Sequence, residues 1–263
     1  MSTYILQIGE AAAPPQTPDF TSNFGDFASF AAMIADADYS RGGSTATYTL
    51  KSDAGQAWGD YYVRQDYPGD GTSYDDRWYW DPSRLASGNY RTISVRVWFR
   101  FASNWGTTSD IKWFAQAANG SHPRWIIKPG HNSNTQKIRL RKSGSGSSAE
   151  RLMDAVNAAW SNLYNGNWHE LRIRMVKSTD DVTADGVFRA SIDGTILDTT
   201  DTSDGGSGSD GDGITTDVTG VYFGQFEIMS DGAPSNGGTA TWTDIGEIDV
   251  WTSDLGDSWL AGG

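Results

Sequence analysis

The stretch Thr92–Ala102 reads TISVRVWFRFA and decides the fold class. From position 95 onward, apolar residues alternate with arginine or tryptophan, which is the period of a β-strand with one buried face. The buried set is Val95, Val97, Phe99 and Phe101, and the opposite set is Arg96, Trp98 and Arg100. This stretch therefore predicts a half-buried strand with a polar outer side.

Similar alternation recurs along the chain and predicts further strands. They are expected at Thr45–Lys51, Trp58–Gln65, Asp110–Ala115, Arg124–Lys128, Lys137–Arg141, Trp168–Val176, Val221–Met229 and Thr243–Trp251. Asp193-Gly194 lies between Phe188–Ile192 and Thr195–Leu197 and predicts a hairpin, because both turn residues tolerate positive φ. The expected fold class is all-β, an antiparallel two-sheet β-sandwich with one short helix.

That helix is expected at Ala149–Trp160, where Ser147 and Glu150 have the spacing of a capping box. A weaker helical pattern covers Phe27–Ile34. The chain has 263 residues, no cysteine and 37% apolar residues, enough for one core without disulfides. We expect an extended N-terminal arm over 1–25, where clustered prolines suppress helix and sheet, and one sandwich domain over 26–263.

Some motifs resemble known β-sandwich families. Gly166–Arg174, the Phe188–Leu197 hairpin and Ile245–Trp251 are similar to the late strands of concanavalin A-like lectin and glucanase domains. Val95–Trp113, with Asn104-Trp105 and Lys112-Trp113, resembles heparin-lyase-like polysaccharide lyases of the same jelly roll. The resemblance covers residues 45–255 and implies a concanavalin-like jelly roll. It implies no particular activity, because lectins, hydrolases, lyases and structural modules share this scaffold.

Charge is distributed unevenly. The net charge is −13, yet the segment 91–177 holds 14 Lys and Arg against 4 Asp and Glu. The total argues against a nucleic acid partner, which needs a basic footprint. Guanidinium and ammonium groups on one polar sheet face would instead hold carboxylates or sulfates. The predicted glycan-binding residues are Arg96, Trp98, Arg100, Lys112, Arg124, Lys128, Arg139, Arg141, Arg172 and Arg174, with Lys137 beside them. The alternative is a solvated face balanced by the acidic flanks.

Two carboxylates, Glu247 and Asp249, are similar to the E-x-D-x-E signature of glucanases, but Trp251 stands where the third carboxylate is required. Strict alternation places Ile245, Glu247, Asp249 and Trp251 on one face of the strand. We interpret the pair as structural.

A polysaccharide lyase needs a base for the C5 proton and a cation that neutralises the uronate. The catalytic candidates are His122, His131 and Tyr222, with Arg124 or Lys128 as the neutralising group. The run Val221–Phe226 lacks the lysine and second tyrosine of the lyase motif, and His169 is expected to be structural. Calcium is the one cofactor left open, with Asp204, Asp210 and Asp212 as candidate ligands, although the spacing of a full calcium loop is missing.

The sequence thus predicts a module that binds an anionic polysaccharide on a basic sheet face. Its alternatives are a polysaccharide lyase acting on a polyuronate or sulfated glycan, and a structural decoration or fibre protein of a virion. Met1–Glu10 lacks the features of a signal peptide, and no run of apolar residues is long enough for a membrane span. We expect the protein outside cells or on a virion surface, where the arm would contact a capsid or tail.

Overall fold

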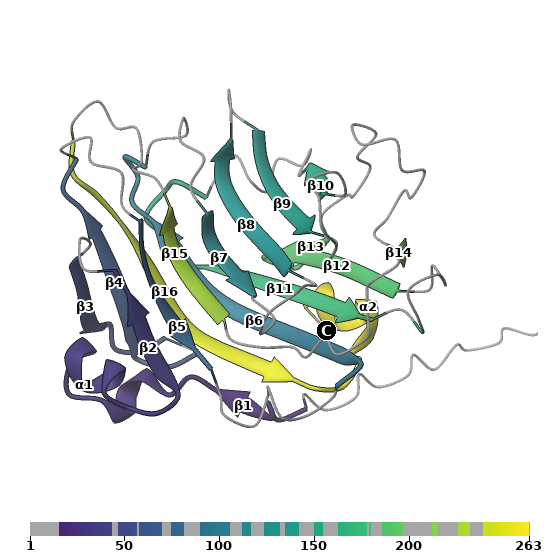
Figure 1. Ribbon diagram of the computed structural model, residues 1–263, viewed down its shortest axis with the longest axis horizontal. Coiled ribbons are helices and arrows are strands. Elements are labelled where there is room, and N and C mark those ends of the chain that lie inside the picture. Colours follow the sequence, from purple (N-terminus) through teal and green to yellow (C-terminus); the bar gives the residue numbers. More distant parts are fainter. Residues whose placement is uncertain are drawn as a thin grey trace, which may run out of the picture.

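The computed structural model describes residues 16–43, 47–56, 58–69, 75–81, 90–105, 112–116, 124–131, 135–141, 150–154, 163–177, 179, 186–196, 212–214, 226–231 and 239–262. Between residues 112 and 154, and in 212–214, the description is of the backbone. Over these ranges the chain forms two antiparallel β-sheets with two short helices, as Figure 1 shows. The predicted all-β sandwich is confirmed.

The larger sheet, here sheet A, has the strand order β13-β12-β11-β6-β16-β4-β3, with β1 paired to β16 and β14 to β12. Its strands are β1 (Phe20–Thr21), β3 (Thr47–Ser52), β4 (Tyr61–Tyr67), β6 (Thr92–Phe101), β11 (His169–Val176), β12 (Gly186–Ile192), β13 (Thr195–Ile196), β14 (Asp212–Ile214) and β16 (Thr241–Trp251). The central strand β6 is the stretch from which the fold class was predicted.

The smaller sheet, sheet B, has the order β10-β9-β8-β7-β15-β5-β2. Its strands are β2 (Tyr39–Gly42), β5 (Asp75–Trp80), β7 (Lys112–Gln116), β8 (Arg124–His131), β9 (Thr135–Arg141), β10 (Glu150–Asp154) and β15 (Phe226–Asp231). The strands β1, β2, β5 and β14 were not predicted. In β5, DDRWYW places aromatic residues on both sides of the strand, so it lacks the alternation that marks a half-buried strand.

The core lies between the two sheets. From β6 it takes the predicted set Val95, Val97, Phe99 and Phe101, each no more than 1% exposed. Sheet B contributes Trp78, Trp80, Phe226 and Ile228. The helix α1 (Phe30–Ile34), whose N-cap Ser29 accepts a hydrogen bond from Ala32 N, adds Phe30. The Phe30 ring stacks on Tyr48 of β3 at 4.9 Å and meets Trp78 of β5 edge-on at 6.3 Å, so it joins the two sheets.

The predicted helix at Ala149–Trp160 is wrong over its first part. Residues 150–154 form β10, paired antiparallel with β9. The pairing puts Glu150 opposite Arg141 and Asp154 opposite Lys137, and opposite charges across neighbouring strands stabilise a sheet. Local helical spacing was overridden by this tertiary pairing. Positions 155–160 lie outside the described residues.

The hairpin prediction is confirmed up to Ile196, and position 197 lies outside the described residues. Asp193 and Gly194 have φ of 49° and 74° and join β12 to β13. Of the expected N-terminal arm, residues 19–22 lie along β16 of sheet A, where β1 pairs with Asp249 and Val250. Phe24 is buried against Tyr39 and Trp78 of sheet B. Positions 1–15 lie outside the described residues. None of the helices in the described part of the chain is long and apolar enough to cross a membrane.

Candidate functional site

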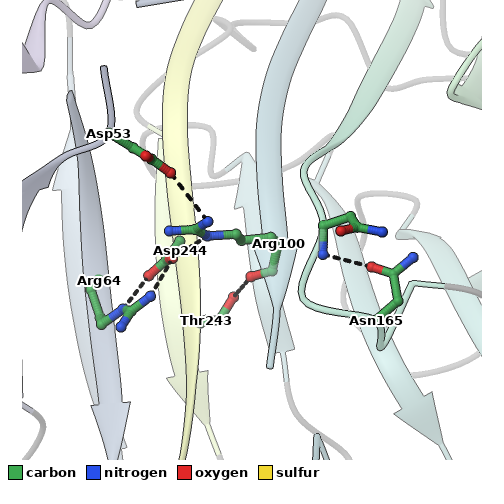
Figure 2. Close-up of polar contacts among 7 residues, drawn as sticks. Asp53, Arg64, Arg100, Asn165, Thr243 and Asp244 are labelled. Atoms are coloured by element: carbon green, nitrogen blue, oxygen red, sulfur yellow. Dashed lines mark hydrogen bonds and ion pairs between the residues drawn. The ribbon is translucent and has the colours of Figure 1, made fainter. Parts of the chain in front are cut away.

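The outer face of sheet A, which points away from sheet B, holds a buried carboxylate between two arginines. Asp244 of β16 lies opposite Arg100 of β6 and Arg64 of β4, and its side chain is fully buried. Arg64 donates from Nε and Nη2 at 2.7 and 2.8 Å, and Arg100 donates from Nε at 2.6 Å. Figure 2 shows Arg100 also reaching Asp53, at 3.4 Å. The two cations therefore face two carboxylates.

Aromatic rings flank these guanidinium groups. The Arg64 guanidinium lies 3.9 Å from the ring centroid of Trp242, and that of Arg100 lies 4.4 Å from Trp168 and 4.9 Å from Tyr62. Such contacts stabilise a cation over a π face. The hydrogen bond to Asp244 raises the pKa of the Arg64 guanidinium, which therefore stays charged.

Two more tryptophans extend the aromatic set toward the middle of β6. Trp58 stacks beside Trp98 at 6.2 Å and meets Trp168 edge-on at 4.5 Å. Together Trp58, Tyr62, Trp98, Trp168 and Trp242 are called the aromatic strip. Trp58 and Tyr62 are buried, whereas Trp98, Trp168 and Trp242 are partly exposed. Three indoles are therefore open to solvent next to the polar network.

A β-bulge in β16 makes room for the aromatic strip. Its pairing with β6 shifts between Ile245 and Ile248, so Gly246 and Glu247 together oppose the single residue Trp98. A Cβ on Gly246 would lie 2.7 Å from the Trp58 ring, so glycine is required there. The bulge also corrects the predicted alternation of this strand.

The core side of β16 takes Ile245, Ile248 and Val250, whereas Asp244 and Asp249 lie opposite Arg100 and Arg96 on the outer side. The prediction that Ile245 shares a face with Asp249 is wrong, because the extra residue of the bulge reverses the parity after position 246. No sequence motif marks this bulge other than an isolated glycine within a strand.

Below the bulge lies a second carboxylate group. Asp249 is 1% exposed and accepts hydrogen bonds from Thr21 Oγ1 at 2.8 Å and from Arg96 Nε at 3.0 Å. Burial, and then the neighbouring charge of Asp249, raise the pKa of the half-buried Glu247 to about 7. Asp249 thus ties β1 and β6 to β16, which agrees with the structural interpretation of this residue.

The C-terminal segment covers the outer face of sheet A at its other end. Arg174 binds Asp254 at 2.6 Å and Asp257 at 2.8 Å, and Arg172 pairs with Glu170 and donates to the Trp259 carbonyl. The helix α2 (Gly256–Leu260) is held there, with the Leu260 carbonyl accepting from Ser191 Oγ. All four predicted arginines of sheet A, at 96, 100, 172 and 174, are therefore paired with carboxylates of the chain.

The structure divides the predicted glycan-binding residues between the two sheets. Arg96, Trp98, Arg100, Arg172 and Arg174 lie in β6 and β11 of sheet A. Lys112, Arg124, Lys128, Arg139 and Arg141 lie in β7, β8 and β9 of sheet B. The prediction of one shared face is wrong, because the chain passes from sheet A to sheet B between β6 and β7 and returns between β10 and β11. Strand order of this kind cannot be read from alternation alone.

Of the catalytic candidates, His131 is the last residue of β8, and His122 and Tyr222 lie outside the described residues. His169 agrees with its expected structural role. It is buried, its Nδ1 lies 2.7 Å from Asp193 Oδ2, and its Nε2 lies 3.2 Å from Asn165 Oδ1. Asp193 also accepts from Glu170 N, so the pair fastens the hairpin turn to β11.

The calcium candidates Asp204 and Asp210 lie outside the described residues, and Asp212 begins β14. Within the described ranges, no three histidine, aspartate or glutamate side chains are grouped so that they could hold a metal. Apart from Trp98, the aromatic strip was not predicted from the sequence. The sequence of β4, YYVRQDY, does indicate a polar outer side, because Tyr62, Arg64 and Asp66 alternate with the residues that face the core.

Comparisons with known proteins support the fold. No family model and no curated protein matches the sequence. Among solved structures, the chain is similar to "Cellulose induced protein, Cip1", with a TM-score of 0.52 and 10% identity over 83% of this chain and 93% of that one. It is also similar to the binding domain of botulinum neurotoxin DC in complex with SialylT, with a TM-score of 0.51 and 12% identity over 85% and 44% of the two chains.

A third similar structure is of botulinum neurotoxin type C, whose title concerns its interaction with two ganglioside molecules. The TM-score is 0.50 and the identity 13%, over 87% of this chain and 46% of that one. The chain thus spans less than half the length of the neurotoxin chains. At these identities the likenesses show the fold alone, which is a jelly-roll-like β-sandwich.

Proposed function

We propose that this protein is a carbohydrate-binding module whose aromatic strip binds a polysaccharide on the outer face of sheet A. The observation on which the proposal rests is that Trp98, Trp168 and Trp242 are partly exposed on the side of a sheet that does not face the sandwich core. Partly exposed indoles offer flat apolar surfaces to the C–H faces of sugar rings.

Polar groups suited to sugar hydroxyls lie among these indoles. The Asp53 carboxylate is 44% exposed and lies 3.4 Å from Arg100, which itself lies between Trp168 and Trp242. A few placed polar groups in an aromatic surface are the usual composition of a ligand site. The similar neurotoxin binding domains, whose titles name SialylT and gangliosides, support the choice of glycan as the ligand class.

Charge in this face is balanced, so the aromatic strip favours stacking and hydrogen bonding over ion pairing. Arg64 and Arg100 are opposed by Asp53 and Asp244, and Arg96 is opposed by Asp249. A preference for an anionic polysaccharide therefore needs cations elsewhere in the molecule. The lyase alternative has no arrangement among the described residues that favours it.

Affinity electrophoresis through gels containing a neutral β-glucan tests this proposal. Trp168→Ala is expected to weaken retardation about tenfold, because the exposed indole provides the stacking surface. Tyr61→Ala is the matched control, since Tyr61 is exposed but lies off the aromatic strip. Equal retardation of the Trp168 variant and the parent, with both folded by circular dichroism, would contradict the proposal, as would no retardation of the parent by any of a panel of neutral glycans.

A further inference from the structure

Five cationic residues occupy adjacent register positions in β8 and β9. Arg124 lies directly opposite Arg141, and Lys128 lies directly opposite Lys137. Arg139, between the two pairs, lies opposite Ile126. Along each strand these positions are two residues apart or four apart, so the sheet alternation puts all five on the same face. They are called the cationic face.

Strand pairing identifies which face this is. Ile228 of β15 is buried in the core. Across the neighbouring strands it is in line with Phe114 of β7, Ile127 of β8 and Ile138 of β9. Residues in line across a sheet share a face, so positions 127 and 138 belong to the core side. The five cationic positions have the other parity and belong to the side away from sheet A.

Like charges directly opposite one another destabilise a sheet. On the far side of β9, β10 places Glu150 opposite Arg141 and Asp154 opposite Lys137, which leaves five cations with two acidic neighbours in register. An anionic ligand would relieve the repulsion within the cationic face.

We propose that the cationic face binds an anionic polysaccharide at a site separate from the aromatic strip. The cations of one row lie on strands about 5 Å apart, and successive rows lie about 7 Å apart, which suits a polymer with one carboxylate or sulfate per sugar ring. The proposal extends the proposed function to a second surface and a defined ligand class.

A polysaccharide fits better than nucleic acid. Outside residues 91–177 the chain carries 6 Lys and Arg against 29 Asp and Glu, so it repels dense polyanions. Duplex DNA has one charge per about 1.7 Å of axis and would meet far more of this repulsion than a polymer charged once per sugar. The choice of polysaccharide also rests on the proposed glycan-binding function.

The test removes one opposed pair of charges. The double variant Lys128→Gln/Lys137→Gln is titrated with sodium polygalacturonate at about 20 and 200 mM NaCl. The control is Lys51→Gln/Arg91→Gln, which removes one cation in β3 of sheet A and one directly before β6. The parent is expected to bind polygalacturonate and to lose affinity as the salt concentration rises. At low salt the affinity of the Lys128→Gln/Lys137→Gln variant is expected to be about five- to tenfold lower than that of the parent, whereas the affinity of the control should be unchanged. Its melting temperature is expected to stay the same or rise, because a like-charge pair is removed.

Several outcomes would overturn the proposal. They are no binding of polygalacturonate at low salt, equal losses in the two double variants, or tighter binding of a 20-base-pair DNA duplex than of polygalacturonate. Trp168→Ala separates this site from the aromatic strip, since it is expected to leave polygalacturonate binding intact while weakening neutral glucan binding about tenfold. Failure of one site is therefore seen independently of the other.

Discussion

At the scale of single residues, the fully buried Asp244 is the residue on which the outer face of sheet A depends most. It accepts three hydrogen bonds from Arg64 and Arg100 and has no contact with solvent. Removing one partner of a buried ionic group leaves the others uncompensated, which destabilises proteins by about 3–5 kcal/mol. Asp244 is therefore a structural residue that holds the arginines against the indoles.

We expect Asp244→Asn to lower the free energy of unfolding by about 3 kcal/mol, measured by urea denaturation. Asp53→Asn is the matched control, because Asp53 is 44% exposed and its ion pair is long, and its effect should stay below about 1 kcal/mol. Similar small effects for both substitutions would show that Arg64 and Arg100 do not need their buried counter-charge.

Glu247 gives the stability of the protein a pH dependence. Its folded pKa of about 7 lies above the ordinary value of 4.5, because burial and Asp249 disfavour the charged form. The folded state therefore binds the proton more tightly than the unfolded state, and stability is lost as pH rises from 4.5 through 7. Glu247→Gln keeps a neutral hydrogen-bonding side chain at every pH.

At pH 8 the Glu247→Gln variant should be more stable than the parent by on the order of 1 kcal/mol, a value discounted because the half-buried group is screened by solvent. At pH 4, below the unfolded pKa, the two proteins should unfold alike. Urea denaturation at both pH values measures this, and a variant that is less stable at pH 8 would contradict the assignment.

At the scale of elements, the bulge in β16 changes which residues of this strand lie on the outer face of sheet A, compared with the prediction from strict alternation. Alternation correctly gave β6 and the positions of most other strands, although their bounds differ by one to five residues, because those strands have one apolar side. It failed for β16 after Ile245, where one extra residue reverses the parity. It also could not show that β6 and β8 belong to different sheets, because strand order depends on contacts far apart in the sequence.

Gly246→Ala tests the packing of Trp58 against the bulge. The added Cβ would lie within 2.7–3.0 Å of three carbons of the Trp58 ring, so the ring must move. Overpacking of this kind destabilises by about 1–3 kcal/mol. In a Trp58→Ala background the same substitution should cost close to nothing, and the double-mutant cycle by thermal denaturation should show this coupling. Additive effects would mean that Trp58 does not lie on Gly246.

At the scale of the whole molecule, the two sheets and the two ends of the described chain are joined near Ser22. Its Oγ accepts from Ile248 N at 3.0 Å at the end of the bulge, and its carbonyl accepts from Tyr39 OH of β2 in sheet B. Ser22 directly follows β1, and before β1 the Gln16 carbonyl accepts a hydrogen bond from Trp251 Nε1 at 2.9 Å. Residues 16–25 are therefore part of the sandwich, and the sheets should unfold together.

Ser22→Ala leaves the buried Ile248 N–H without its acceptor, a loss of about 1–3 kcal/mol. For a protein of this size, the melting temperature should fall by about 2–4 °C for each kcal/mol. Because Ser22 joins both sheets, tryptophan fluorescence and far-ultraviolet circular dichroism should shift together in a single transition. Ser253→Ala is the control, since Ser253 is exposed and its 3.3 Å contact with Gln16 should contribute less than about 0.5 kcal/mol. If the two probes separate, so that one sheet melts before the other, then the contacts at Ser22 do not couple the halves of the sandwich.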